Sequence, residues 1–214
     1  MAPKLTLLYF DSSFWRAEMC RLALHIGGVE FEDKRCTREE FQAAKAAGEY
    51  PFGSVPVLYV EEGGASTCIA QSPSIARYCG KVAGLYPTDD LGAAVVDQIL
   101  DSANDCTETL SASMREEDME TRLQMRKDVA ATVLPTWLGY YEALLEEADG
   151  PFFAGEALTV ADLCVAGLLG WLTSGVLDGI PTTLAEPFPC VTKMLSEVAS
   201  QPKIQEWTQM HAKL

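Results

Sequence analysis

The chain has 214 residues, with 16 lysine and arginine residues against 31 aspartate and glutamate residues, which gives a formal net charge of −15. This negative charge would repel a nucleic-acid backbone and an anionic lipid surface, so neither is expected as a partner. With 48% hydrophobic and 22% charged residues, the composition is that of an ordinary globular protein, and it argues against extended disorder.

The short apolar runs and the cysteine pattern indicate in which cellular compartment the protein is expected. The N-terminal run Leu5–Phe10 ends at Asp11 and is too short for the core of a signal peptide. The longest apolar stretch, Leu163–Leu177, lies between Asp162 and Asp178 and is too short to span a membrane, so we expect a buried helix. The seven cysteines include no Cys-x-x-Cys pair, which favours reduced thiols over a disulfide scaffold or a zinc ribbon. These features predict a cytoplasmic protein.

Charge divides the chain into two parts. Residues 1–86 carry 9 basic and 10 acidic side chains, net −1, whereas residues 87–214 carry 7 and 21, net −14. Pro87 and the polar run Thr88–Asp90 mark a helix start at this boundary.

The first part alternates between strand and helix patterns. Strands are expected at Lys4–Phe10, Val29–Arg35, Pro56–Val60 and Thr67–Ala70, and helices at Trp15–Gly27, Arg38–Ala47 and Ser72–Val82. The last two strands flank Glu62-Gly63-Gly64 and are typical of a hairpin. The order β-α-β-α-β-β-α predicts an α/β layer.

The second part shows only helical patterns. Helices are expected at Leu91–Met114, Met119–Ala148 with a kink at Pro135, Thr159–Val176, Phe188–Ala199 and Pro202–Met210. Thr159 and Asp162 have the spacing of a capping box. The fold class predicted from pattern alone is therefore an α/β module followed by an all-α module.

Tyr9 lies at the carboxyl end of the first strand, where open α/β sheets place ligands. A phenol there can donate a hydrogen bond to an anion, although an ordinary strand aromatic has the same pattern. Ser12 and Ser13 in the following loop are alternative donors.

Two further segments favour the binding of an extended peptide. The X-Pro bond of Val55-Pro56 can be cis, which would leave the Val55 backbone as an unpaired edge for an added strand. Ser72 is a natural N-cap, and its helix start is a ready site for a carboxylate. A plain turn and simple helix capping are the structural alternatives.

The spacing of Tyr9-Phe10 and Arg16-Ala17-Glu18, with the segments Pro51–Leu58 and Gln71–Tyr78, resembles the Tyr-type cytosolic glutathione transferases, most of all their sigma-like group. The resemblance covers nearly the whole chain. It implies a thioredoxin-like glutathione-binding domain at residues 1–83, followed by an all-α domain at residues 88–214. The second domain would carry a hydrophobic substrate pocket and the interface of a homodimer.

The same resemblance implies roles for individual residues, with glutathione as co-substrate. Tyr9 would hydrogen-bond to the glutathione sulfur, with the Arg16 cation beside it, and these two are the expected catalytic residues. Val55 would pair with the cysteinyl unit, and Lys45 would meet the glycyl carboxylate. The other implied contacts are Phe10, Phe41, Ser54, Pro56, Gln71 and Ser72 for the peptide, and Asp105 for the γ-glutamyl amine of the neighbouring subunit's glutathione.

The sequence departs from the family pattern at three places. Phe41 stands where relatives often have Trp, and Ser54 where Lys or Gln is common, so each position lacks a long donor. The two changes together predict peptide binding weaker by about 1–3 kcal/mol. The loop Asp11–Trp15 is one residue longer than usual and lacks the Arg-Gly pair, which leaves Ser12 or Ser13 open as the sulfur contact.

An acidic helix face and an apolar pocket complete the expectations. Asp97, Asp101 and Asp105 recur at every fourth residue, either as a solvated face or near a cation, so a divalent metal near Asp97 and Asp101 stays open although no metal is assigned to the site. The electrophile pocket is expected to include Phe10, Phe14 and Trp15, with contributions from the region of Met114 and from the C-terminus.

The implied function is glutathione transferase activity. The enzyme would activate the glutathione thiol as a thiolate for conjugation to small hydrophobic electrophiles, as in detoxification. A non-catalytic ligand-binding or structural member of the same fold is one alternative. A glutathione-dependent isomerase similar to prostaglandin D synthase, or a peroxidase, is the other.

Overall fold

The computed structural model describes residues 2–211, which form two compact units. The first contains residues up to 87 together with the C-terminal helix α10 (Pro202–His211), and the second contains residues 88–201. The change of unit at Pro87 lies at the boundary inferred from charge. Helix α10 groups with the first unit rather than with the helical domain, because its buried Trp207 packs against His25 and Phe31.

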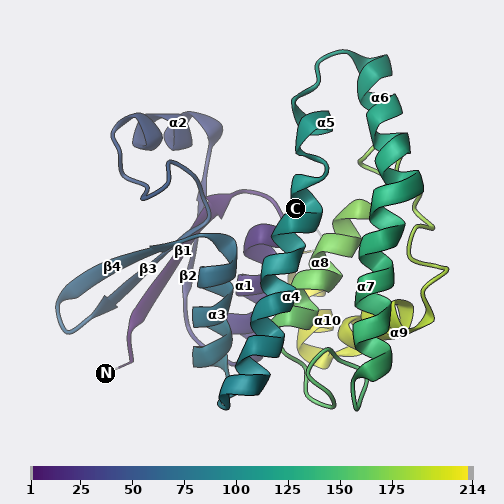
Figure 1. Cartoon of the computed structure of the whole chain (residues 1–214). Coiled ribbons are helices and arrows are strands. Elements are labelled where there is room, and N and C mark those ends of the chain that lie inside the picture. The colour runs from purple at the N-terminus through teal and green to yellow at the C-terminus, as the bar shows by residue number, and fades with distance from the viewer. Residues whose placement is uncertain (1, 212–214) are drawn as a thin grey trace. The chain divides into compact units, whose positions relative to one another are not determined.

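The first unit is a four-stranded mixed sheet with three helices from the N-terminal part of the chain. The strands are β1 (Lys4–Phe10), β2 (Glu32–Cys36), β3 (Val57–Glu62) and β4 (Ala65–Ala70), in the spatial order β2-β1-β3-β4. β1 pairs with β2 in parallel and with β3 antiparallel, and β3 and β4 form the predicted hairpin. The helices are α1 (Trp15–Ile26), α2 (Arg38–Ala46) and α3 (Ser72–Ala83), of which α1 and α3 lie side by side (Figure 1). This confirms the thioredoxin-like fold.

Alternation along β1 separates two packing faces. Leu8 and the half-buried Phe10 pack on the face covered by α2, where they meet Phe41. Leu7 and Tyr9 are buried on the opposite face, the one available to α1 and α3. Tyr9 therefore lies on the face of the sheet opposite to α2.

Gly27 lets α1 and α3 approach each other closely. A Cβ atom built on Gly27 would lie 2.6 Å from both the Cα and the Cβ of Ala83, at the end of α3. A side chain at this position would force the backbone at Ala83 to shift, so the close approach requires glycine.

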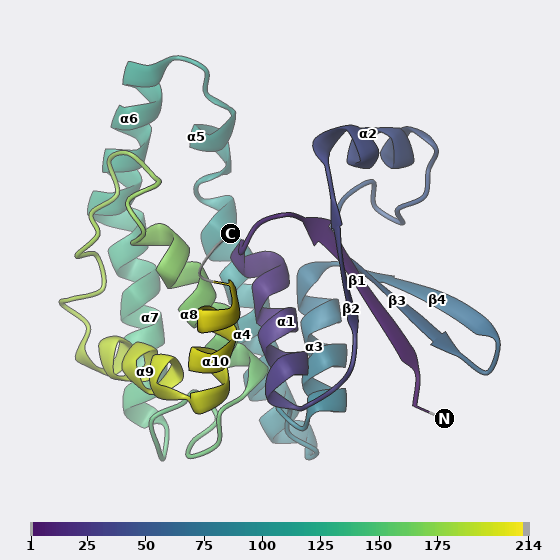
Figure 2. The same cartoon turned by 180° about the vertical axis from the view of Figure 1, so that it is seen from behind.

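The second unit contains only helices in the described residues, as predicted. They are α4 (Asp90–Glu108), α5 (Ser111–Arg115), α6 (Met119–Asp128), α7 (Leu134–Glu147), α8 (Val160–Leu172) and α9 (Pro189–Ser200), with a π-helical turn, η1 (Val129–Val133), between α6 and α7. α8 is buried on most sides and packs against α4 and α9 (Figure 2). The Thr159–Asp162 capping box forms at its start: the N–H and hydroxyl of Thr159 donate to Asp162 at 2.7 and 2.8 Å.

Two helix predictions in this unit were wrong in their extent. The helix predicted at Leu91–Met114 stops at Glu108, where the Thr109 hydroxyl donates to the carbonyl of Cys106 at 2.6 Å and competes with the backbone ladder. The helix predicted at Thr159–Val176 stops at Leu172, three residues before Gly175 at φ 84°.

The helical form changes just before Pro135. The π-helical turn η1 lies between α6 and α7, and the Leu134 N–H donates five residues back to the carbonyl of Val129. Proline lacks an N–H and crowds the preceding turn, and a π-helical turn accommodates both effects.

All seven cysteines are free thiols, and Cys20 and Cys79 are buried as expected. Within residues 2–211, no helix is both long and apolar enough to cross a membrane.

Candidate glutathione site

The strand registers bring the three predicted segments to one edge of the sheet. Leu8 of β1 lies opposite Val57 of β3, and Val57 lies opposite Ala70 of β4. The next residues outward are Tyr9, Pro56 and Gln71. Segments separated by up to about 60 residues therefore meet at one end of three neighbouring strands, where the sequence predicts ligand binding.

Tyr9 combines a buried ring with an available hydroxyl. The residue is only 6% exposed. Its hydroxyl has no hydrogen-bond partner among the described residues. Burial raises the pKa of Tyr9, and the charges of Arg16 and Arg21 oppose this effect. The phenol is therefore protonated at neutral pH and can donate.

The loop after Tyr9 presents its serines to solvent. Ser12 and Ser13 are both exposed, and the Ser12 N–H donates to the carbonyl of Phe10 at 2.8 Å. The half-buried Arg16 lies with its guanidinium carbon 4.7 Å from the centroid of the Trp15 ring. Trp15 itself is only 1% exposed, so its expected role in a substrate pocket is wrong: it is a core residue at the start of α1.

The Val55 segment has the features of a binding edge. The Val55–Pro56 bond is cis, the option that the sequence left open. Among residues 2–211, no backbone hydrogen bond involves Val55, and the preceding Ser54 is exposed. The Val55 N–H and C=O are thus available to an extended peptide.

Helix α2 supplies an aromatic platform and a cation beside this edge. The Phe41 ring stacks on Tyr50 with centroids 5.8 Å apart and meets Phe10 edge-on at 5.2 Å. The exposed Lys45 has its Nζ 5.7 Å from the Phe41 ring centroid, and its Cε lies 3.5 Å from the position of a Cβ on Gly53. Lys45 therefore stands next to the loop that leads to Val55, while Phe41 contributes packing and no polar donor.

Gln71, rather than the predicted Ser72, is the N-cap of α3. Gln71 is exposed, has φ 72° and makes no side-chain capping bond, whereas Ser72 is the first helical residue and is only 4% exposed. Pro73, in the first turn, has no N–H to donate. Ser72 lies inside the helix, and its N–H is one of the free donors at the helix start. The helix start still offers free N–H groups and a positive dipole end to a carboxylate.

Asp105 lies in the second unit, exposed on α4. Asp97 and Asp101 share that helix, and each already takes part in interactions. Among the described residues, neither belongs to a group of three possible metal ligands.

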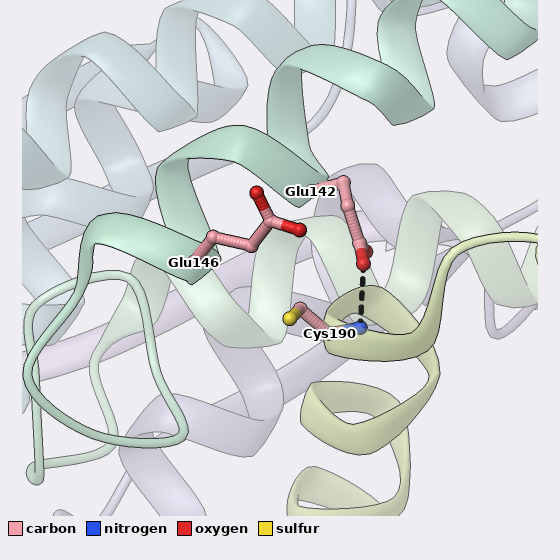
Figure 3. A group of neighbouring side chains, drawn as sticks. All are labelled: Glu142, Glu146 and Cys190. Atoms are coloured by element: carbon pink, nitrogen blue, oxygen red, sulfur yellow. Dashed lines mark hydrogen bonds between the residues drawn. The ribbon is translucent and has the colours of Figure 1, made fainter.

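The one such group in the described part of the chain is Glu142, Glu146 and Cys190 (Figure 3). The Glu142 carboxylate accepts hydrogen bonds of 2.9 Å from the backbone N–H groups of Cys190 and Val191. It caps the start of α9, which is a structural role.

Sequence reasoning missed Arg21. Its side chain is fully buried and donates to Asp33, to Glu18 and to the carbonyl of Ser12 in the loop after Tyr9. Its spacing in the sequence could have indicated burial, because Arg21 follows the buried Ala17 by four residues and so lies on the apolar face of α1.

Comparison with known proteins places both units in one family. The family profile "Glutathione S-transferase, N-terminal domain" matches residues 5–81, and "Glutathione S-transferase, C-terminal domain" matches residues 104–211. The chain is 32% identical to glutathione S-transferase 1 of Ascaris suum, over 96% of this chain and 95% of the relative. It is 27% identical to hematopoietic prostaglandin D synthase of Gallus gallus, over 99% and 98% of the two chains.

A solved structure agrees with these matches. The glutathione S-transferase from Ascaris lumbricoides superposes with a TM-score of 0.82 at 30% identity, and the match covers 99% of both chains. The chain belongs to the glutathione S-transferase family.

Proposed function

We propose that this chain conjugates glutathione to small hydrophobic electrophiles, with Tyr9 stabilising the glutathione thiolate. Glutathione is the co-substrate of the family to which the chain belongs. The observation that carries the assignment of Tyr9 is the place of its hydroxyl, which has no hydrogen-bond partner among the described residues, at the sheet edge shared with Val55 and Gln71.

The chemistry follows from the difference between thiol and thiolate. A free thiol has a pKa near 8.5, so only a small fraction is the nucleophilic thiolate at neutral pH. The Tyr9 hydroxyl and the Arg16 cation favour the anion, and each unit by which they lower the thiol pKa corresponds to about 1.4 kcal/mol. The thiol proton leaves to solvent. The sulfur lone pair then forms a carbon–sulfur bond, and a leaving group departs with its electron pair.

The peptide would lie along the free edge at Val55. Its cysteinyl backbone would exchange hydrogen bonds with the Val55 N–H and C=O. The γ-glutamyl carboxylate would accept from the start of α3 at Ser72 and from the exposed Gln71 amide. The glycyl carboxylate would meet Lys45. The Phe41 ring offers no donor, so we expect weaker affinity for glutathione than in relatives that carry Trp at this position.

We also propose that the chain acts as a homodimer in the cytoplasm. Dimerisation is typical of the family, and the exposed Asp105 would reach the γ-glutamyl amine of glutathione bound to the neighbouring subunit. The seven free thiols favour a reducing compartment.

A glutathione-dependent isomerase is the second candidate, favoured by the match to a prostaglandin D synthase along nearly the whole chain. Its chemistry would use the same thiolate. The two functions differ in the electrophile and not in the glutathione site.

One set of assays separates the candidates. The purified chain is bound to immobilised glutathione and eluted with free glutathione, and its turnover is measured with an aryl halide and with a prostaglandin endoperoxide. Turnover of the aryl halide supports the transferase, and turnover of the endoperoxide alone supports the isomerase. Retention without turnover of either would contradict both and favour a non-catalytic binding protein.

A further inference from the structure

A buried arginine joins α1 to the loop that follows Tyr9. Arg21 is fully buried, and its Nη1 donates to the carbonyl of Ser12 at 2.8 Å. Its Nε donates to Asp33 Oδ1 at 2.9 Å, while its Nη2 has no partner among the described residues. A cation so placed needs a compensating anion, and Asp33 is its shortest charged contact.

A second arginine holds the same loop from the other side. Arg35 lies directly opposite Tyr9 in the parallel pairing of β1 and β2. Its Nε and Nη2 donate to Asp33 Oδ2 at 2.8 and 2.6 Å, and its Nη1 donates to Asp11 Oδ1 at 3.2 Å. Asp33 thus bridges two arginines, one holding Ser12 and the other holding Asp11.

The network reaches the C-terminal helix through Glu18. Glu18 Oε2 accepts from Arg21 Nη1 at 3.0 Å, and Glu18 Oε1 accepts from the Trp207 indole N–H at 2.6 Å. All these residues belong to the first unit. Glu18 is therefore fixed on both sides, and Arg21 has little freedom to find another partner.

We propose that Asp33 is a positioning residue of the glutathione site, which fixes the loop between Tyr9 and Arg16 through Arg21 and Arg35. The inference rests on the proposed function of Tyr9. The position of the loop depends on contacts made within this chain, among them the bonds of Arg21 to the Ser12 carbonyl and of Arg35 to Asp11. Displacement of a catalytic group by about 1 Å can cost about a hundredfold in rate.

The test uses Asp33→Asn, which keeps the shape of the side chain and one acceptor but removes the charge. Its matched control is Glu32→Gln, on the exposed neighbour in the same strand. Among the described residues, the Glu32 carboxylate accepts only from the Thr6 hydroxyl, at 3.1 Å. Both are measured by kcat and KM for glutathione across pH, with a thermal melt. For Asp33→Asn we expect kcat to fall about tenfold to a hundredfold, with the midpoint of the kcat–pH profile moved to higher pH and KM changed less. Glu32→Gln should match the wild type.

Arg35→Gln covers the case in which Asp33→Asn fails to fold. The Arg35 side chain is 22% exposed. This change removes the branch that runs from Asp33 through Arg35 to Asp11, and it leaves the bonds of Arg21 to Asp33 and Ser12 in place. Arg35→Gln should lower kcat by less than Asp33→Asn does. It should also move the midpoint of the kcat–pH profile to higher pH. A lower melting temperature with an unmoved profile in the folded variants would mean a merely structural role and would overturn the proposal.

The double variant Tyr9→Phe with Asp33→Asn distinguishes this inference from the proposed function. If Asp33 acts through Tyr9, the double variant should show no movement of the profile beyond that of Tyr9→Phe alone. Additive movements would overturn the inference and leave Tyr9 in place. An unmoved profile in Tyr9→Phe alone would count against the proposed function itself.

Discussion

The backbone carbonyl of Gln71 accepts a hydrogen bond of 3.0 Å from the N–H of Ile75 and closes the first turn of α3, while Gln71 itself holds φ 72°. For a residue other than glycine, such a backbone costs about 1–3 kcal/mol. The strained residue is exposed at the site edge. We interpret the strain as the means by which the amide is presented to the ligand.

Two substitutions at Gln71 separate strain from binding. Gln71→Gly should relieve the strain and raise the free energy of unfolding by up to about 1 kcal/mol, after the greater freedom of glycine in the unfolded chain is deducted. Gln71→Ala should keep the strain. Both should raise KM for glutathione, because both remove the amide. Urea unfolding and initial rates check the two effects, and an unchanged KM in both variants would remove Gln71 from the site.

Gly27→Ala should destabilise the first unit by about 1–3 kcal/mol, because the added methyl group meets the backbone of Ala83. Gly170→Ala is the matched control, because Gly170 lies in α8 with open space around its Cβ position. That change should be neutral or stabilising, since alanine favours helix more than glycine does. Urea unfolding measures the change in the free energy of unfolding for both variants. An equal change in the two would contradict the close approach of α1 and α3.

Asp162→Ala should cost at least about 2 kcal/mol, because it leaves three buried donors, on Phe153 and Thr159, without an acceptor. Asp118 is the comparison, since it accepts from the Thr121 N–H at the exposed start of α6. Water can replace that cap, so Asp118→Ala should lower the free energy of unfolding by less than Asp162→Ala does. A smaller loss of unfolding free energy for Asp162→Ala than for Asp118→Ala would refute the argument from burial.

Cys190 offers a test of local electrostatics. Burial raises the pKa of its thiol, and the carboxylates of Glu142 and then Glu146 raise it further. A raised pKa lowers the thiolate fraction at pH 8, so alkylation should be slow and should accelerate with rising pH. Glu146→Gln removes one of the carboxylate charges and should speed the alkylation of Cys190.

Cys68 serves as the internal reference for that experiment. It is half-buried, and its pKa is raised by burial without any contribution from Glu146. Peptide mass spectrometry after iodoacetamide treatment gives the ratio of Cys190 to Cys68 labelling. A ratio that Glu146→Gln leaves unchanged would contradict the electrostatic account.

The sequence predicts the fold where local signals and tertiary packing agree. β1 matches its predicted bounds because its apolar run is buried on both faces, and the start of α8 matches because Thr159 and Asp162 satisfy each other. β2 begins three residues later than predicted. It is an edge strand whose charged residues, such as Asp33 and Arg35, are satisfied by ion pairs that no apolar alternation reveals.

The site was predictable only as separate segments. Tyr9, Val55 and Gln71 could each be proposed from a strand end or a proline, and the strand registers bring them together. The link from Arg21 to Ser12 depends on how α1 packs, so residue spacing alone does not reveal it. The strained backbone of Gln71 could not be predicted either. Ser72 has the side chain that is typical of an N-cap, so the sequence favours Ser72 and not Gln71 as the cap of α3.

The most direct test of the account is the pKa of glutathione bound to the wild type and to Tyr9→Phe, followed by the ultraviolet absorbance of the thiolate across pH. We predict a bound thiol pKa below the free value of about 8.5 in the wild type, and a clear rise towards that value in Tyr9→Phe, with Ser12→Ala and Ser13→Ala behaving as the wild type. A bound pKa that Tyr9→Phe leaves unchanged would contradict the central claim.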